Sequence, residues 1–204
     1  MRKLLITTLT AAAACACSES TRTPAAPTEY TAPLQVQAAQ PEGTAKNHGT
    51  HLVGEQENPP RDTRAQGQAI FKVAADRKSV DYKLIASNIE NVFMAHIHCG
   101  VAGENGSIIV WLFPSTATAP GPTGTGRHDG VLAEGTFSAE NVQVAADDIQ
   151  ICPGGVRAGN LEDVLARIEE GKAYVNVHTN DGVAPPNTGP GDFPGGEIRG
   201  QLDK

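Results

Sequence analysis

The feature that most constrains the fold of this chain is a series of short alternating segments separated by glycine and proline. The clearest pair is Val92–His98, where apolar and polar side chains alternate, and Ser107–Phe113, a β-branched run that ends in an aromatic residue. The Gly-rich sequence GVAGENG at 100–106 lies between them and favours a tight turn. We therefore expect a β-hairpin whose first strand carries His96 and His98 on one face.

Other segments predict strands or a helix by the same criteria. The expected strands are Gln66–Ala74, Val80–Ser87, Gly130–Phe137, Ala173–Thr179 and Gly196–Leu202. The expected helix is Leu161–Glu170, with Asn160 as its N-cap and Gly171 as its stop. With 22 Gly, 14 Pro and 4% aromatic residues, the composition suits short strands joined by turns. The fold predicted is an all-β Greek-key β-sandwich, immunoglobulin-like or superoxide-dismutase-like, with one short helix.

The N-terminal segment is predicted to be a signal peptide. Two basic residues precede Leu4–Ala14, an apolar run too short to span a bilayer. Small residues then lead to Cys15 and Cys17, either of which would be the acylated cysteine of a bacterial lipoprotein. The alternative is an ordinary signal peptide cut near Ala16. We expect an exported protein of the bacterial cell envelope, facing the periplasm or at the surface and anchored to the membrane by a lipid.

The chain divides into three predicted parts: a signal segment at 1–17, a disordered tether rich in Pro, Thr and Ala at 18–51, and one domain at 52–204. His48 and His51, at the end of the tether, are expected to be solvated. The formal net charge of −7, without a basic stripe, argues against a nucleic-acid-binding protein.

Several motifs resemble the CHRD domain, which is named after chordin and also occurs alone in microbial secreted proteins. The resemblance extends from Leu52 to Leu202 and rests on AHIH at 95–98, the glycine turn that ends at Gly106, YVNVHT at 174–179 and GEIRGQL at 196–202. Because chordin sequesters growth factors, the resemblance implies protein binding. A partner protein in the cell envelope is therefore one expectation.

Cys99 and Cys152 are the two cysteines of the predicted domain. In an oxidising compartment two such thiols are expected to form a disulfide, worth up to about 4 kcal/mol by the chain-entropy estimate. The alternative is that Cys99, beside His98, binds a soft metal.

Three histidines form the candidate metal site. His96 and His98 share one face of their strand, and His178 lies on a later strand that also carries Tyr174 and Asn176. If the two strands are neighbours, the three imidazoles converge on the solvent-facing side of the sheet, under the loops 115–129 and 180–195. Three neutral imidazoles suit copper or zinc, with copper favoured by the affinity order. The alternative is that they only form hydrogen bonds with their neighbours.

A weaker resemblance, to copper/zinc superoxide dismutase, supports copper. The His96-x-His98 pair and the strand-end His178 match its copper ligands in layout. His128 is a further candidate ligand in a segment similar to part of its zinc loop, and the alternative is that it is a loop residue with no role in the site. Its other zinc ligands have no clear counterparts, so this resemblance is limited to the copper side.

Glu197 and Arg199 alternate with apolar residues on the last predicted strand. They are expected either to form an exposed cross-strand ion pair or to orient a histidine as outer partners of the site. No phosphate-binding loop, serine-hydrolase elbow or paired-carboxylate motif is present in the sequence. We expect a non-catalytic copper-binding domain; the alternatives are a metal-free interaction module and a copper oxidoreductase.

Overall fold

The computed structural model describes residues 46–115 and 118–202. The predicted signal peptide, Cys15, Cys17 and the predicted tether up to residue 45 lie outside the described part. Within that part, no helix is long and apolar enough to cross a membrane.

The described residues form eight strands and one α-helix. The strands are β1 (Asn47–Val53), β2 (Gln66–Val73), β3 (Ser79–Glu90), β4 (Val92–Cys99), β5 (Ser107–Phe113), β6 (Arg127–Ser138), β7 (Ala173–Thr179) and β8 (Ile198–Leu202). The helix is α1 (Leu161–Glu169), and short 3-10 helices occur at Gly54–Gln56 and Ala139–Asn141.

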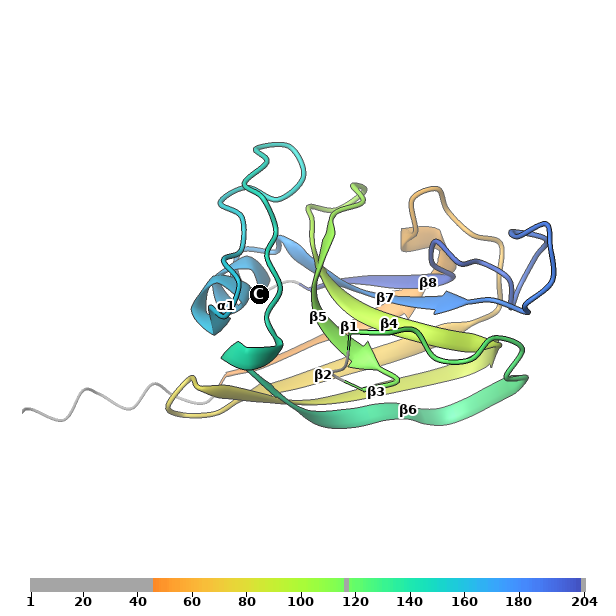
Figure 1. Ribbon diagram of the computed structural model, residues 1–204, viewed down its shortest axis with the longest axis horizontal. Coiled ribbons are helices and arrows are strands. Elements are labelled where there is room, and N and C mark those ends of the chain that lie inside the picture. Colours follow the sequence, from red (N-terminus) through yellow and green to blue (C-terminus); the bar gives the residue numbers. More distant parts are fainter. Residues whose placement is uncertain (1–45, 116–117, 203–204) are drawn as a thin grey trace, which may run out of the picture. The chain divides into compact units, whose positions relative to one another are not determined.

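All strand pairs are antiparallel, and the strand order is β5-β4-β7-β8-β1-β2-β3-β6. The sheet folds back on itself, so that β4, β5, β7 and β8 form one layer and β2, β3 and β6 form the other (Figure 1). This arrangement confirms the predicted all-β sandwich with one short helix.

An apolar core fills the space between the two layers. Phe71 of β2 and Phe137 of β6 meet edge to face, with ring centroids 6.3 Å apart. Tyr82 of β3 packs beside them, and its hydroxyl donates a hydrogen bond to the carbonyl of Leu112 on β5 at 2.7 Å. This buried bond connects the two layers directly.

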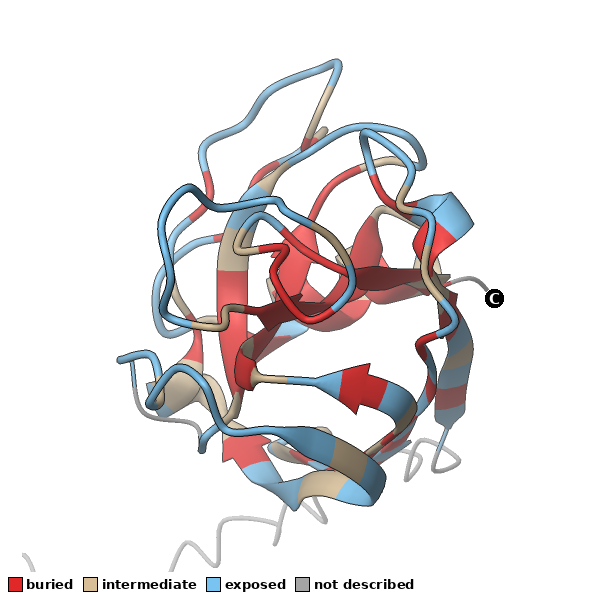
Figure 2. Ribbon diagram, turned by 90° about the vertical axis from the view of Figure 1, so that its right-hand side faces the viewer, coloured by how far each residue is buried: buried red, intermediate tan, exposed pale blue. Residues whose placement is uncertain are grey.

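The two layers differ in how their outer faces are covered. Strand β2 alternates strictly between exposed and buried residues, as expected for a sheet with one wet face. In contrast, every residue of β7 is buried, and Met94 is the one residue of β4 that is not fully buried. Figure 2 shows these buried strands beneath loops that are largely exposed. The expectation that the polar side of these strands faces solvent is therefore wrong.

The predicted boundary between tether and domain, at residue 52, differs from the structure. Residues 47–53 form β1, which pairs with β2 along its whole length. His48 lies opposite Phe71 and is buried, whereas His51 is exposed as expected. The error arose because this segment is too polar to show a hydrophobic pattern, although β2 supplies its hydrogen-bonding partners.

Helix α1 agrees with its prediction to within one residue. The Asn160 side chain accepts a hydrogen bond from the backbone N–H of Asp163 at 3.2 Å and so caps the first turn. The apolar face of the helix is buried, and Gly171 follows its end at a φ of 70°.

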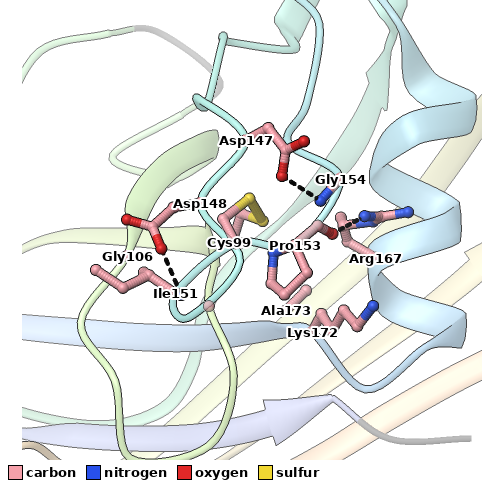
Figure 3. Close-up of a disulfide and its surroundings, with 12 residues drawn as sticks. Cys99, Gly106, Asp147, Asp148, Ile151, Pro153, Gly154, Arg167, Lys172 and Ala173 are labelled. Carbon is pink, nitrogen blue, oxygen red and sulfur yellow. Dashed lines mark hydrogen bonds between the residues drawn. A yellow bond between two sulfur atoms is a disulfide. The ribbon is translucent and has the colours of Figure 1, made fainter.

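The predicted disulfide is present between Cys99, the last residue of β4, and Cys152. Figure 3 shows the hydrogen bonds that hold the segment around Cys152. The carboxylates of Asp147 and Asp148 accept hydrogen bonds from backbone N–H groups of this segment, and Arg167 of α1 donates one to the Pro153 carbonyl. The disulfide therefore ties this segment to the end of β4. Since its sulfur is oxidised, the alternative role of Cys99 as a soft metal ligand is wrong.

Candidate metal centre

The register between β4 and β7 brings the candidate ligands together. It runs without interruption from Met94 to Cys99, with His96 opposite Asn176 and His98 opposite Tyr174. Directly opposite residues point to the same face of an antiparallel pair. His96 and His98 therefore share one face with His178, which lies opposite Met94.

The three imidazoles converge as predicted. One ring nitrogen from each of His96, His98 and His178 lies within 4.8 Å of the others. The Nδ1 of His96 is 3.2 Å from the Nε2 of His178. With metal–nitrogen bonds of about 2.0–2.1 Å, two ligands at that separation subtend an angle of about 100° at one ion. The pair has the spacing of two ligands of a single metal ion.

Backbone carbonyls determine which ring nitrogen of His98 and of His178 keeps a free lone pair. His98 Nδ1 lies 2.9 Å from the carbonyl of Gly106, and His178 Nδ1 lies 2.9 Å from that of Pro194. Both nitrogens must donate to these oxygens, so the Nε2 of each ring carries a lone pair. His96 Nδ1 then donates to His178 Nε2. His98 Nε2 is buried without a hydrogen-bond partner in the described structure.

Gly106 is required for this arrangement because the turn approaches β4 closely. A Cβ atom at this position would lie 1.7 Å from the Cys99 carbonyl oxygen. The Gly106 N–H donates to the Tyr174 hydroxyl at 3.1 Å, while its carbonyl accepts from His98. One residue thus positions both the imidazole and the ring stacked on it.

Burial keeps the three imidazoles neutral. Their exposed fractions are 0% for His96, 8% for His98 and 6% for His178. Removal from water lowers the pKa of His96 to about 2, that of His98 to about 4 and that of His178 to about 3. Repulsion within the cluster lowers the pKa of His96 and His178 further, and Arg199 does so for His98. Neutral imidazole is the form that binds metal ions.

Aromatic rings surround the cluster on the outer face. Trp111 contacts His96 edge to face, with ring centroids 4.1 Å apart. Tyr174 stacks on His98, with ring centroids 4.8 Å apart and an interplanar angle of 8°. Phe93, at an irregularity in the β4–β7 register, lies 6.4 Å from His178. Strict alternation along β4 would place Phe93 on the face opposite to the histidines, but at this irregularity in the register its ring lies beside His178.

Arg199 and Glu197 do not form the exposed ion pair that was one interpretation of the sequence. Both are buried, at 1% and 0% exposure. The Arg199 guanidinium lies 3.4 Å from the centre of the Tyr174 ring, whose other neighbour in the stack is His98. It donates to the carbonyls of Glu104 and Val101 at 2.9 and 3.1 Å. Arg199 therefore reaches His98 through a shared aromatic ring.

The Glu197 carboxylate forms hydrogen bonds with three residues around the end of β7. It accepts hydrogen bonds from the hydroxyls of Thr63 and Thr179, each at 2.6 Å, and from the N–H of Gly191 at 2.8 Å. Thr179 is the neighbour of His178 in the chain. Glu197 thus holds the segment that supplies the Pro194 carbonyl, and it acts on the histidine through the backbone.

A further buried acid beside the cluster was not identified from the sequence. Glu57 is 5% exposed and accepts a hydrogen bond from the side chain of Asn176 at 2.7 Å. Burial raises its pKa to about 8, although Arg199 and Arg61 oppose the shift. Nothing in the local sequence around Glu57 indicates that this segment folds over β7, where Asn176 lies.

His128 does not join the cluster. It lies on β6, opposite Ile89 of β3, in the other layer of the sandwich. The metal-compatible group found among the described residues contains His96, His98 and His178. The suggestion that His128 is an additional ligand is therefore wrong. It rested on a motif in a segment that was expected to be a loop and is the beginning of β6.

Residues 49–202 match the family model of the CHRD domain. No curated protein and no solved structure matches the chain significantly.

Proposed function

The chain belongs to the CHRD domain family, and we propose that this member is an exported, lipid-anchored domain that binds one copper ion through His96, His98 and His178. The observation that carries the proposal is the convergence of three buried, neutral imidazoles, two of them oriented by backbone carbonyls. Ligating histidines are commonly oriented in this way, by an acceptor on the nitrogen that does not bind the metal.

The energetics of the metal-free cluster support a ligand. A buried polar atom without a partner costs about 1–3 kcal/mol, and His98 Nε2 is such an atom. An interior selected only for stability would favour apolar side chains at these positions. A metal ion would instead use the lone pair of His98 Nε2 that the protein leaves without a partner.

The donor set favours copper. Imidazole nitrogen binds copper and zinc well, and Cu²⁺ exceeds Zn²⁺ in the general affinity order. The group contains neither a carboxylate nor a thiolate, since both cysteines of the described chain are in the disulfide. Hard cations such as calcium, which prefer oxygen ligands, are therefore poor candidates.

The proposed location rests on the sequence and on the disulfide. The basic residues, the short apolar run and the cysteines at 15 and 17 favour export and lipid attachment. The Cys99–Cys152 bridge suits an oxidising compartment such as the periplasm. We infer that the lipid holds the copper-binding domain at a membrane surface in the cell envelope.

Copper titration of the metal-stripped protein tests the site. We expect about one copper per chain for the wild type, and no stoichiometric binding when His96, His98 and His178 are all replaced by Ala. The matched controls are His51→Ala, at an exposed position of β1, and His128→Ala, outside the cluster; both should bind copper as the wild type does. Circular dichroism and urea unfolding would show that the triple variant is folded.

A wild-type protein that takes up no copper, or a folded triple variant that still binds it, would refute the site. Failure to bind any metal would leave an interaction module whose partner is another envelope protein. The anchor is tested separately by fractionating cells that express Cys15→Ala or Cys17→Ala. One of these changes should release the protein from the membrane; if neither does, an ordinary signal peptide is the better interpretation.

A further inference from the structure

Met94 lies on the same face as the histidines. It is directly opposite His178 in the β4–β7 ladder and two residues before His96 on β4. Directly opposite residues have Cβ atoms about 5 Å apart, and residues two apart along a strand lie on the same face. The methionine side chain is long and flexible, so its sulfur can reach a metal held between these two histidines.

The electrostatic surroundings disfavour a doubly charged ion. Arg199 is buried, and although Glu57 and Glu104 attract its charge from farther away, no carboxylate of the described residues lies within ion-pair distance of it. Its guanidinium is separated from His98 by the Tyr174 ring alone. The three histidine ligands are neutral, so they cannot offset the charge of a metal ion placed beside this cation.

We propose that the site is built for Cu(I), with Met94 as the fourth ligand; this inference rests on the proposed copper site. Thioether sulfur is a soft ligand and selects Cu(I). The cost of moving an ion out of water rises steeply with its charge, so a dry site of neutral ligands favours the monovalent ion. Arg199 adds to this preference because it repels the second charge of Cu(II) more than it repels the first.

The decisive test compares the protein's affinity for Cu(I) with its affinity for Cu(II). Cu(I) affinity would be measured without oxygen, by competition with the chelator bicinchoninate in the presence of ascorbate. Cu(II) affinity would be measured in air, by competition with nitrilotriacetate. We expect the wild type to bind Cu(I) more tightly than Cu(II). Equal binding, or tighter binding of Cu(II), would overturn the preference while leaving the copper site in place.

Met94→Leu removes the sulfur and keeps the size of the side chain. Cu(I) affinity should fall by at least the roughly tenfold that is lost even on removal of an outer partner, while Cu(II) affinity changes much less. Unchanged Cu(I) affinity would refute ligation by Met94. Since Met1 and Met94 are the two methionines of the sequence, selenomethionine labelling provides a second measurement. A copper–selenium distance in the X-ray absorption spectrum, lost in Met94→Leu, is the expected signature; its absence in the labelled wild type would also refute ligation.

Arg199→Gln tests whether the positive charge of Arg199 contributes to the preference for Cu(I). Loss of the positive charge should favour Cu(II) over Cu(I) by about tenfold, equivalent to a reduction potential lower by about 59 mV for a one-electron couple. Arg61→Gln is the matched control, because Arg61 lies over Phe193 at 4.7 Å and outside the His98 stack. A potential that shifts equally in both variants would exclude a specific effect of Arg199. If neither Cu(I) nor Cu(II) binds the wild type, the proposed function itself fails.

Discussion

Acidification should destabilise the metal-free protein, because its three buried imidazoles are neutral in the folded state. In the unfolded chain a histidine has a pKa near 6.5, whereas in the folded protein the pKa is about 2 for His96, about 4 for His98 and about 3 for His178. Below pH 6.5 the unfolded state therefore binds more protons, and stability falls as the pH falls. At about 1.36 kcal/mol per pH unit, each histidine costs about 2 kcal/mol by pH 5.

Glu57 has the opposite effect on how stability depends on pH. Its pKa is raised in the folded protein from 4.5 to about 8, so the stability that it contributes is complete below pH 4.5 and is lost as the pH rises through 8. As the pH falls from 7.5 to 5, Glu57 adds about 3 kcal/mol to the free energy of unfolding, whereas the three imidazoles together lower it by roughly 6 kcal/mol. From these four groups the wild type should lose about 3 kcal/mol over this range, and Glu57→Gln about twice as much.

Urea unfolding of the metal-free protein at pH 7.5 and pH 5.0 measures these differences, provided that the transitions are two-state and the urea dependence is unchanged. Other titrating groups, such as the buried His48, cancel when the two proteins are compared. His51→Gln, at an exposed position, serves as the control and should show the wild-type pH dependence. The reasoning is refuted if Glu57→Gln is no more acid-sensitive than the wild type, or if His178→Gln, which removes one imidazole, loses as much stability as the wild type.

Two further predictions concern the structures that support the site. Gly106→Ala should destabilise the fold and weaken copper binding, since the added Cβ would meet the Cys99 carbonyl at 1.7 Å; wild-type stability and affinity by urea unfolding and chelator competition would contradict this. Replacing both Cys99 and Cys152 by Ala opens a loop with a sequence separation of 53 and should cost about 4 kcal/mol of unfolding free energy, and a loss below about 1 kcal/mol would argue against the chain-entropy account.

Features that depend on local pattern were predictable. Period-2 alternation identified β2, β3, β4 and β7, because side chains on a strand alternate between faces whatever the strand pairs with. The helix was predictable because its cap, its apolar spacing and its glycine stop all lie within a dozen residues. His96 and His98 could be placed on one face for the same reason, and the pairing of the two domain cysteines followed from their number and the expected compartment.

What the tertiary structure decided was the environment of that face. The order of strands makes β7 the neighbour of β4, and that adjacency brings His178 to the other two histidines. Loops distant in the sequence then cover the face, so side chains expected in solvent are buried, and Glu57 and Arg199 come close to the cluster. Burial and pKa depend on atoms brought together from across the chain. A strand's own alternation shows which side chains share a face, and the segments that fold over it determine whether that face is wet or dry.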